Sequence, residues 1–359
     1  MSKKICFFMD TIQGSGGISR VNWLVISGLN TKEYEIHVLG LFKGGNKRYF
    51  YPEEIKTAYL FKEQISNSKR FIKAVKAVRE YIVENKIEIF ICSGEINFPI
   101  VSAALIGLQT KLICWEHSNV SVQNEHKFQR TCRFIGAKTA DVIVTLTKKD
   151  KQLYRDTYHV KKCVHIYNPV DDQLIKEVKY DREAKKIISV GRLCYQKNFE
   201  CTIKVAEKVL KRYPEWRWDI YGEGEEYTIL NQMIAEKKLN GKVCLMGRVD
   251  DLYDRYKKYS MLVMTSRFEG FPMTLLESTA TGLPAVSFDV LTGPNEIIDN
   301  GENGYLVKFE LVDTMVEKIC YLIDHPEIRQ RMSDYNCYKR LEFRKENIID
   351  KWEDLLANF

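Results

Sequence analysis

Long apolar runs, paired cysteines and short repeats are all missing from this chain of 359 residues. The first apolar stretch, Ile5–Met9, stops at Asp10, and the chain has no run of 18 apolar residues, which predicts neither a signal peptide nor a membrane-spanning helix. The ten cysteines contain no Cys-x-x-Cys pair, so zinc sites and disulfides are not expected. We therefore expect a cytoplasmic protein in a reducing compartment.

The composition is that of an ordinary globular protein, with 45% hydrophobic and 29% charged residues. The length predicts about two domains. The net charge of +7 is unevenly distributed, because residues 1–170 carry a net charge of +11 and the remainder a net charge of −4. This asymmetry indicates that only the first domain meets an anionic partner.

Short apolar strands alternate with amphipathic helices along the chain, a pattern typical of parallel α/β folds. We expect strands at residues 4–9, 35–41, 88–92, 111–115, 142–146 and 163–167, and again at 186–190, 217–221, 243–246, 261–264 and 284–288. Two doubly wound parallel sheets fit this series better than one large sheet. A break around Asn168-Pro169 gives an N-terminal domain of residues 1–170, a C-terminal domain of residues 171–340 and a last helix in residues 341–359.

A loop with glycine follows the first strand of each expected domain. These loops contain Gly14-Ser15-Gly16-Gly17 and Gly191-Arg192, and each would lead from a strand into a helix. The backbone N–H groups of such turns can hold a phosphate, here in a cleft between the domains. A nicotinamide-dependent oxidoreductase would also need an acidic residue at the end of the second strand, where this chain has Val38–Leu41. The loops therefore favour a phosphate ligand and disfavour that enzyme class.

Two cations follow the first strand of the second half. Arg192 stands where that strand ends, and Lys197 lies five residues later, at the expected start of a helix. A guanidinium fork and an ammonium group on one side of a cleft suit a diphosphate. Two solvated surface cations are the alternative interpretation.

The most specific segment is TSRFEGFPMTLLESTATGLP, residues 265–284. Glu269 lies in the loop after a strand, Pro272 suits the first turn of a helix, and Glu277 would sit in the second turn. Backbone N–H groups near Met273–Leu275 would be free to meet phosphate. Because carboxylates accept hydrogen bonds from hydroxyls, the two glutamates suit the recognition of a sugar.

With these segments the second half resembles the donor-binding domain of family 4 glycosyltransferases, which are retaining enzymes with the GT-B fold of two facing Rossmann-like domains. The matching segments are GRLCYQKNF, IYGEGEE, VCLMGRV, TSRFEGFPMTLLESTATGLP and GPNEIIDNGENGYLV. In the first half, GSGGISRV resembles the glycine loop of the family, and WEHSN stands where the family places a histidine. The resemblance covers nearly the whole chain.

The resemblance implies that Arg192 and Lys197 hold the donor diphosphate, with Gly16 and Gly17 closing on it from the other domain. It implies transfer with retention, by front-face attack through an oxocarbenium-like transition state. Charge grows on the leaving diphosphate, so these cations and the helix N-termini would supply most of the stabilisation. No metal or other cofactor is implied, which agrees with the absence of an Asp-x-Asp triplet from the sequence.

The resemblance also implies which residues meet the sugar. Glu277 would accept from the ribose hydroxyls, Glu269 from hydroxyls of the transferred sugar, and His117 would lie near the reacting centre. Taken as a bare residue, a single histidine after an apolar strand is more often structural. The other implied donor-binding residues are Gly222, Glu223, Gly247, Val249, Met273, Thr274 and Leu275, with Asn295 and Glu296 beside the sugar or phosphate.

Cations recur at helical spacing in the basic half. A helix expected at residues 68–85 would bury one face, formed by Phe71, Val75, Val78 and Ile82. The candidate cations are Lys69, Lys73 and Lys76 on this helix and Lys127, Arg130 and Arg133 after the His117 loop. These side chains suit an anionic membrane and a lipid diphosphate, although solvated helix faces are an equal alternative. No nucleic-acid-binding module accompanies the charge.

The last segment carries apolar residues at helical intervals, namely Phe343, Ile348, Trp352 and Leu355. The resemblance implies that this helix crosses back to the first domain. We expect an enzyme that is peripheral on the inner face of the cell membrane. Its donor would be a hexose or N-acetylhexosamine linked to UDP, and its acceptor a lipid-diphosphate-linked saccharide in surface polysaccharide biosynthesis. A soluble or protein acceptor, or a nucleotide-sugar-binding protein without turnover, are the alternatives.

Overall fold

The computed structural model describes residues 2–14, 16–44, 49–63, 67–120, 127–175, 180–249 and 252–359. The chain divides into two compact units, the first formed by Met1–Pro169 with Lys345–Phe359 and the second by Val170–Arg344. The sequence predicted domain boundaries after residues 170 and 340, and the structure has them after residues 169 and 344. Within the described ranges, no helix is long and apolar enough to cross a membrane.

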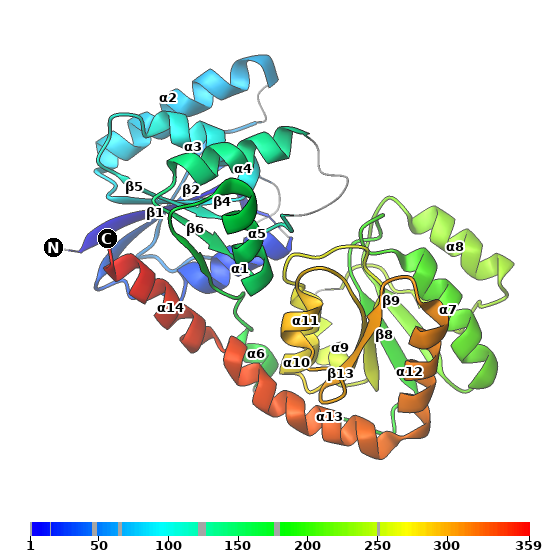
Figure 1. Cartoon of the computed structure of the whole chain (residues 1–359). Helices are drawn as coiled ribbons and strands as arrows, with labels where there is room; N and C mark the ends of the chain where they lie inside the picture. The colour runs from blue at the N-terminus through cyan, green and yellow to red at the C-terminus, as the bar shows by residue number, and fades with distance from the viewer. Residues whose placement is uncertain are drawn as a thin grey trace. The chain divides into compact units, whose positions relative to one another are not determined.

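The first unit is built on a parallel sheet of seven strands in the order β3-β2-β1-β4-β5-β6-β7 (Figure 1). Its strands are β1 Lys3–Gln13, β2 Tyr34–Gly44, β3 Lys56–Phe61, β4 Ile89–Ser93, β5 Lys111–Trp115, β6 Val142–Thr145 and β7 Cys163–His165. Its helices are α1 Gly17–Ile26, α2 Asn67–Asn85, α3 Phe98–Ala104, α4 Lys127–Thr139, α5 Lys148–Tyr158 and α14 Lys345–Ala357.

Helices cover both faces of this sheet. Phe8 of β1 belongs to the core cluster that includes residues of α2 and α3, whereas Phe7 contacts Trp352 of α14 with ring centroids 6.2 Å apart. Successive residues of a strand point to opposite faces of the sheet, so the two phenylalanines pack against the helices on opposite faces. Figure 1 shows α1 and α14 on the face opposite α2 and α3. Burial on both faces explains why these strands appear in the sequence as continuous apolar runs.

The C-terminal helix α14 belongs to the first unit, although it follows the second unit in the chain. Its Trp352 is fully buried and packs against Trp115, with ring centroids 4.6 Å apart. The prediction that Phe343 shares this helix is wrong, because α14 begins at Lys345. The Phe343 ring instead packs on Phe271 of the second unit, with centroids 5.8 Å apart.

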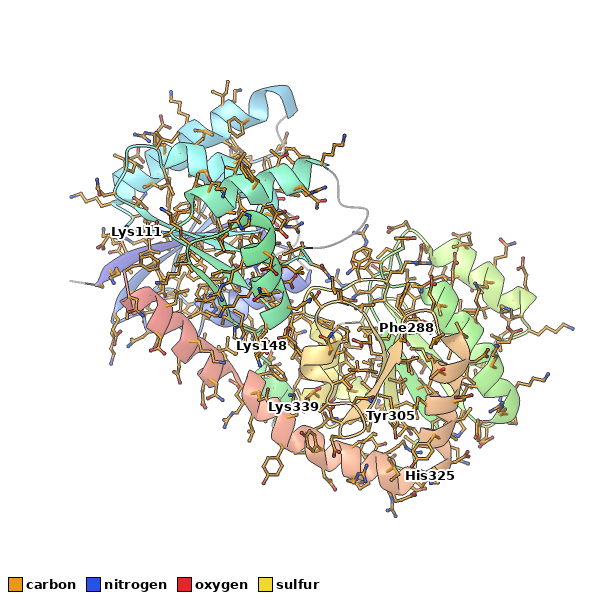
Figure 2. The ribbon with its side chains drawn as sticks, in the orientation of Figure 1. Lys111, Lys148, Phe288, Tyr305, His325 and Lys339 are labelled. Atoms are coloured by element: carbon orange, nitrogen blue, oxygen red, sulfur yellow. The ribbon has the colours of Figure 1, made fainter. Side chains whose placement is uncertain are left out.

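The second unit contains a six-stranded parallel sheet in the order β10-β9-β8-β11-β12-β13. Its strands are β8 Lys186–Val190, β9 Arg217–Tyr221, β10 Val243–Leu245, β11 Met261–Met264, β12 Ala285–Asp289 and β13 Gly304–Lys308. Its helices are α6 Asp172–Ile175, α7 Phe199–Arg212, α8 Tyr227–Glu236, α9 Leu252–Tyr256, α10 Met273–Ala280, α11 Pro294–Ile297, α12 Val312–Asp324 and α13 Pro326–Lys339. Phe288 of β12, labelled in Figure 2, is buried in the core of this unit.

Two strands and one side chain differ from the predictions. The edge strands β3 and β13 were not predicted, because their residues are largely half-exposed and form no continuous apolar run. Helix α2 buries Val78 and Ile82, but Phe71 is 46% exposed. Helix α3, which packs beside α2, has only 7 residues against the 19 of α2, so it cannot cover the whole length of α2.

Candidate functional site

The predicted donor-binding residues of the second half gather at one edge of the second sheet. Because β8 to β12 are parallel, the loops that follow them all leave the sheet at its carboxyl edge. These loops contain Gly191–Asn198 after β8, Gly222–Glu226 after β9, Gly247–Val249 after β10 and Thr265–Pro272 after β11.

Glycines let three of these loops pack backbone against backbone. A Cβ atom at Gly222 would lie 1.8 Å from the carbonyl oxygen of Gly191, and Gly222 has a φ of +140°, which only glycine adopts readily. The Gly222 N–H donates to the Gly247 carbonyl at 2.9 Å. The Glu223 carbonyl accepts from the Leu193 N–H at 2.9 Å, and its side chain is exposed. The structure thus brings Gly222, Glu223 and Gly247 beside the Gly191 turn.

Lys197 and Glu269, predicted for separate roles, form an ion pair. The Lys197 Nζ atom lies 2.6 Å from Glu269 Oε1, and the side chains are only 16% and 6% exposed. Gln196 Nε2 donates to the Phe268 carbonyl at 3.0 Å, which ties the loop after β8 to the loop after β11. A half-buried ammonium and a buried carboxylate therefore lie side by side at the carboxyl edge.

Arg192, unlike Lys197, is largely exposed to solvent. Its side chain is 73% exposed, and its Nη2 atom lies 3.2 Å from Glu225 Oε2. Exposed ion pairs of this kind contribute little to stability, so the guanidinium can exchange its partner at low cost.

Helix α10 begins at Met273, and Pro272 is its N-cap. The N–H groups of Leu275 and Leu276 both donate to the Pro272 carbonyl, at 3.1 and 3.2 Å. The prediction that the Leu275 N–H is free for phosphate is therefore wrong, because the first turn of α10 is tight enough to use it. Met273 and Thr274 occupy the first turn, where backbone N–H groups have no partner within a helix.

Glu277 lies in the second turn of α10, as expected from the sequence, and is 4% exposed. The Tyr256 hydroxyl of α9 donates to Glu277 Oε2 at 2.5 Å. This bond fixes the orientation of the carboxylate. Nothing in the sequence marked Tyr256, because the two residues come from different helices.

The glycine loop of the first unit precedes α1, with Gly16 as the N-cap and Gly17 as the first helical residue. A Cβ atom at Gly14 would lie 2.1 Å from Ser19 Oγ, so a larger residue there would displace the Ser19 side chain. A Cβ atom at Gly16 would meet nothing within 4 Å among the described residues. Ser15 lies outside the described residues. Gly16 therefore leaves open space at a helix N-terminus, which suits the approach of an anion.

His117 follows β5 and is 9% exposed. Its Nε2 atom lies 2.7 Å from Ser93 Oγ at the end of β4, and Ser93 Oγ accepts from Asn22 Nδ2 of α1 at 2.8 Å. The Trp115 ring packs against the imidazole at an interplanar angle of 42°, with ring centroids 4.4 Å apart. Burial lowers the pKa of His117 to about 4, against a smaller opposing effect of the Glu116 carboxylate.

Arg133 was predicted as a surface cation, and this prediction is wrong. Its side chain is 1% exposed, and its Nε atom donates to Glu116 Oε2 at 2.7 Å. The Tyr154 hydroxyl donates to the same carboxylate oxygen at 2.7 Å, and the Ser118 N–H donates to Oε1 at 2.9 Å. Because a buried carboxylate requires a partner, Arg133 turns toward Glu116 rather than toward solvent.

The other predicted cations of the first unit are exposed. They are Lys73 and Lys76 on α2 and Lys127 and Arg130 on α4, whereas the Lys69 side chain lies outside the described residues. Lys76 pairs with Glu80 at 3.7 Å, and both side chains are well exposed.

The second half contains two pairs of adjacent aspartates, Asp171-Asp172 and Asp250-Asp251. Asp171 Oδ1 accepts from the Gln173 N–H at 3.1 Å, in front of α6. Asp250 and Asp251 lie outside the described residues. Among the residues that the structure describes, no group of three or more histidine, cysteine or acidic side chains could hold a metal ion.

Comparison with known proteins places these two units in families. The model "Glycosyl transferases group 1" matches residues 170–337, and "Glycosyltransferase Family 4" matches residues 15–174. An uncharacterized glycosyltransferase of Haemophilus influenzae is 30% identical over 99% of this chain and 100% of its own length.

The names of two other relatives state what they act on or help to make. The amylovoran biosynthesis glycosyltransferase AmsD of Erwinia amylovora is 27% identical, over 98% of this chain and 99% of its own. An α-1,4-N-acetyl-D-galactosaminyltransferase of Campylobacter jejuni, which acts on a saccharide linked to PP-undecaprenol, is 26% identical over 99% of this chain and 98% of its own.

Solved structures show the same fold. A Staphylococcus aureus TarM variant in complex with UDP has a TM-score of 0.82 and 16% identity, covering 98% of this chain and 99% of its own. The lipopolysaccharide outer core galactosyltransferase WaaB has a TM-score of 0.79 and 22% identity, covering 99% of this chain and 100% of its own. With two parallel-sheet units of this architecture and a relative that matches from end to end, the chain belongs to the glycosyltransferases of the GT-B fold.

Proposed function

We propose that this glycosyltransferase moves a hexose or N-acetylhexosamine from a UDP-linked donor to a lipid-diphosphate-linked saccharide, with retention of configuration. The observation that carries the donor half is the Lys197–Glu269 ion pair at the carboxyl edge, with the buried Glu277 in the helix that follows the same loop. An ammonium suits a diphosphate oxygen, and carboxylates suit sugar hydroxyls. The TarM structure with UDP supports the choice of nucleotide.

The residues divide into three roles in this proposal. Glu277, oriented by Tyr256, accepts hydrogen bonds from the ribose. Glu269 accepts from hydroxyls of the transferred sugar, while Lys197 and the exposed Arg192 neutralise the diphosphate. The acceptor hydroxyl attacks the anomeric carbon from the face that the diphosphate leaves. The departing diphosphate oxygen takes the proton of that hydroxyl, so the enzyme itself needs no strong base.

The first turn of α10 adds to this neutralisation. The N-terminus of a helix carries partial positive charge, and Met273 and Thr274 present their N–H groups there. Charge that grows on the leaving diphosphate is then met by protein groups already in place. We therefore propose that transfer requires no metal ion.

We infer the acceptor from the side chains that the first unit exposes. Helix α3 packs against both α2 and α4, and these outer helices expose large apolar side chains between their cations. The exposed apolar residues are Phe71 and Ile72 on α2 and Phe128 and Phe134 on α4, with exposed fractions of 46%, 77%, 63% and 51%. Apolar side chains among lysines and arginines suit the interface of an anionic membrane, where a lipid-linked acceptor lies. The acceptor of the Campylobacter jejuni relative supports this assignment.

Thermal shift with a panel of UDP-, GDP- and ADP-sugars tests the donor. A ligand that binds only the folded state raises the melting temperature, by an amount that grows with ligand concentration. We expect UDP-sugars to stabilise the protein and the others to have little effect. Release of UDP after addition of a lipid-linked saccharide would then establish turnover, whereas stabilisation without any release would indicate a binding protein.

A further inference from the structure

His117 is tied to α1 by two hydrogen bonds in series. Asn22 Nδ2 lies 2.8 Å from Ser93 Oγ, and Ser93 Oγ lies 2.7 Å from His117 Nε2. Asn22 is fully buried and Ser93 is 4% exposed. The three residues come from α1, the end of β4 and the loop after β5. This series of hydrogen bonds therefore connects three segments of the first unit.

The direction of each proton follows from the partners. Asn22 Nδ2 also lies 2.9 Å from the Ile18 carbonyl, which can only accept, so the amide nitrogen faces both neighbours. Ser93 Oγ therefore accepts from Asn22. The proton of the Ser93 hydroxyl then has one acceptor among the described residues, the Nε2 atom of His117. A ring nitrogen that accepts carries no proton, so the proton of the neutral ring is on Nδ1.

The other ring nitrogen, Nδ1, has no partner among the described residues. Within the described part of the chain, Nδ1 of His117 forms no hydrogen bond with the protein, and 9% of the residue is exposed. Burial also keeps the ring neutral at physiological pH, because it lowers the pKa to about 4. The ring therefore presents a single N–H donor.

We propose that Asn22 and Ser93 are positioning residues, which hold His117 as a neutral hydrogen-bond donor through Nδ1. The partner of Nδ1 is an oxygen atom of the bound sugar, and this part rests on the proposed function. His117 thus contributes directed hydrogen bonding and does not transfer a proton. Asn22 and Ser93 act on the reaction only through the imidazole.

Nitrogen-15 NMR of the full chain, labelled at histidine, tests the protonation state without any substrate. A His117→Asn variant identifies the His117 signals among those of the six histidines. We expect the wild-type ring to be neutral with its proton on Nδ1 from pH 6 to pH 8. A ring protonated on Nε2, or one that becomes cationic near pH 6.5, would overturn the proposal whatever the enzymatic activity.

Variants of Ser93 test positioning. Ser93→Ala removes the donor to Nε2, so we expect a mixture of the two ring tautomers and a loss of about tenfold in kcat/KM. Ser93→Thr keeps the hydroxyl and should restore both the tautomer and the rate. Asn22→Leu should resemble Ser93→Ala, and it provides a second variant if the first fails to fold.

The matched control is Ser102→Ala. Ser102 Oγ lies 2.6 Å from Thr139 Oγ1, in a hydrogen bond of the same unit that does not involve His117. We expect this variant to leave both the tautomer and kcat/KM unchanged. An equal loss of rate in Ser102→Ala and Ser93→Ala, with the tautomer unchanged in both, would reduce Ser93 to a structural residue and refute the proposal.

Discussion

At the residue scale, the pairing of Lys197 with Glu269 changes what each side chain can be expected to do. A carboxylate 2.6 Å from an ammonium lowers the net positive charge that a diphosphate would meet. Glu277 has a different described partner, the Tyr256 hydroxyl, which donates to its carboxylate at 2.5 Å. The two glutamates should therefore respond differently to substitution.

Glu277→Ala should weaken the binding of donor and of UDP alike, by about ten- to a hundredfold, because it removes a charged acceptor for the ribose. Glu269→Ala should leave UDP affinity unchanged or higher, since Lys197 loses its ion-pair partner, while turnover falls. Calorimetry with UDP and initial rates with the intact donor measure the two effects. Equal losses of UDP affinity in both variants would contradict the assigned roles.

Acid stability provides a second test at this scale, on His117. The pKa of His117 is about 4 in the folded protein and about 6.5 in the unfolded chain, so the unfolded state binds more protons between these values. Stability should therefore fall as the pH decreases from about 6.5 to about 4, by on the order of 3 kcal/mol from this residue.

Urea unfolding at pH 7 and pH 4.5 measures this dependence. His117→Asn should show a smaller difference between the two pH values than the wild-type protein. His37 is a suitable comparison, because burial also lowers its pKa and gives it a slope of the same sign. A pH dependence that His117→Asn leaves unchanged would contradict the low pKa.

At the element scale, helix α4 has two sides that differ in burial and charge. Its inner side carries Arg133, which neutralises Glu116 next to His117, and its outer side exposes Lys127, Phe128 and Arg130. Substitutions of neighbouring cations on one helix should therefore have unrelated consequences.

Arg133→Met should destabilise the protein by about 3–5 kcal/mol, because it leaves the buried Glu116 carboxylate without its cation. Arg130→Met is the matched control, since Arg130 is exposed, and it should change stability by less than about 0.5 kcal/mol. Urea unfolding measures both. Similar stabilities of the two variants would contradict the buried ion pair.

The outer sides of α2 and α4 should bind anionic vesicles at low salt and release them as the ionic strength rises, because exposed charges are screened within about 8 Å at physiological salt. Replacing Lys73, Lys76 and Arg130 with glutamate should abolish sedimentation with such vesicles. The control variant replaces three exposed lysines of the second unit with glutamate, which changes the net charge by the same amount. These lysines are Lys211, Lys257 and Lys258. Equal loss of binding in the two variants would show that only net charge matters.

At the scale of the whole molecule, each unit offers its carboxyl sheet edge to ligands, because every strand pairing in the two sheets is parallel. The glycine loop and His117 belong to the first unit, and the Lys197–Glu269 pair and Glu277 belong to the second. The residues to which we assign roles in transfer therefore belong to both units.

Transfer should proceed unchanged in EDTA, because Lys197, Arg192 and the first turn of α10 are proposed to neutralise the leaving diphosphate. Initial rates of UDP release with and without EDTA measure this, and Lys197→Ala, which should slow transfer, is run in parallel. Loss of activity in EDTA that manganese restores would contradict transfer without a metal ion.

The sequence by itself determined the features that depend on neighbouring residues. Apolar runs marked most strands, a glycine marked the turn at Gly191, and the spacing of Pro272 and Glu277 placed the carboxylate in the second turn of α10. Backbone sterics and side-chain periodicity act over a few residues, so they can be recognised in a single sequence. The edge strands β3 and β13 lacked that periodicity and were missed.

Only the tertiary structure decided which distant residues meet. Lys197 and Glu269 are 72 residues apart in the chain, and Ser93 and Asn22 are 71 apart, yet each pair shares a hydrogen bond. Arg133 has the helical spacing of a surface cation, but Glu116 at the end of β5 draws it inward. These contacts depend on the order of strands in each sheet and on the need of buried polar groups for partners, neither of which a local pattern contains.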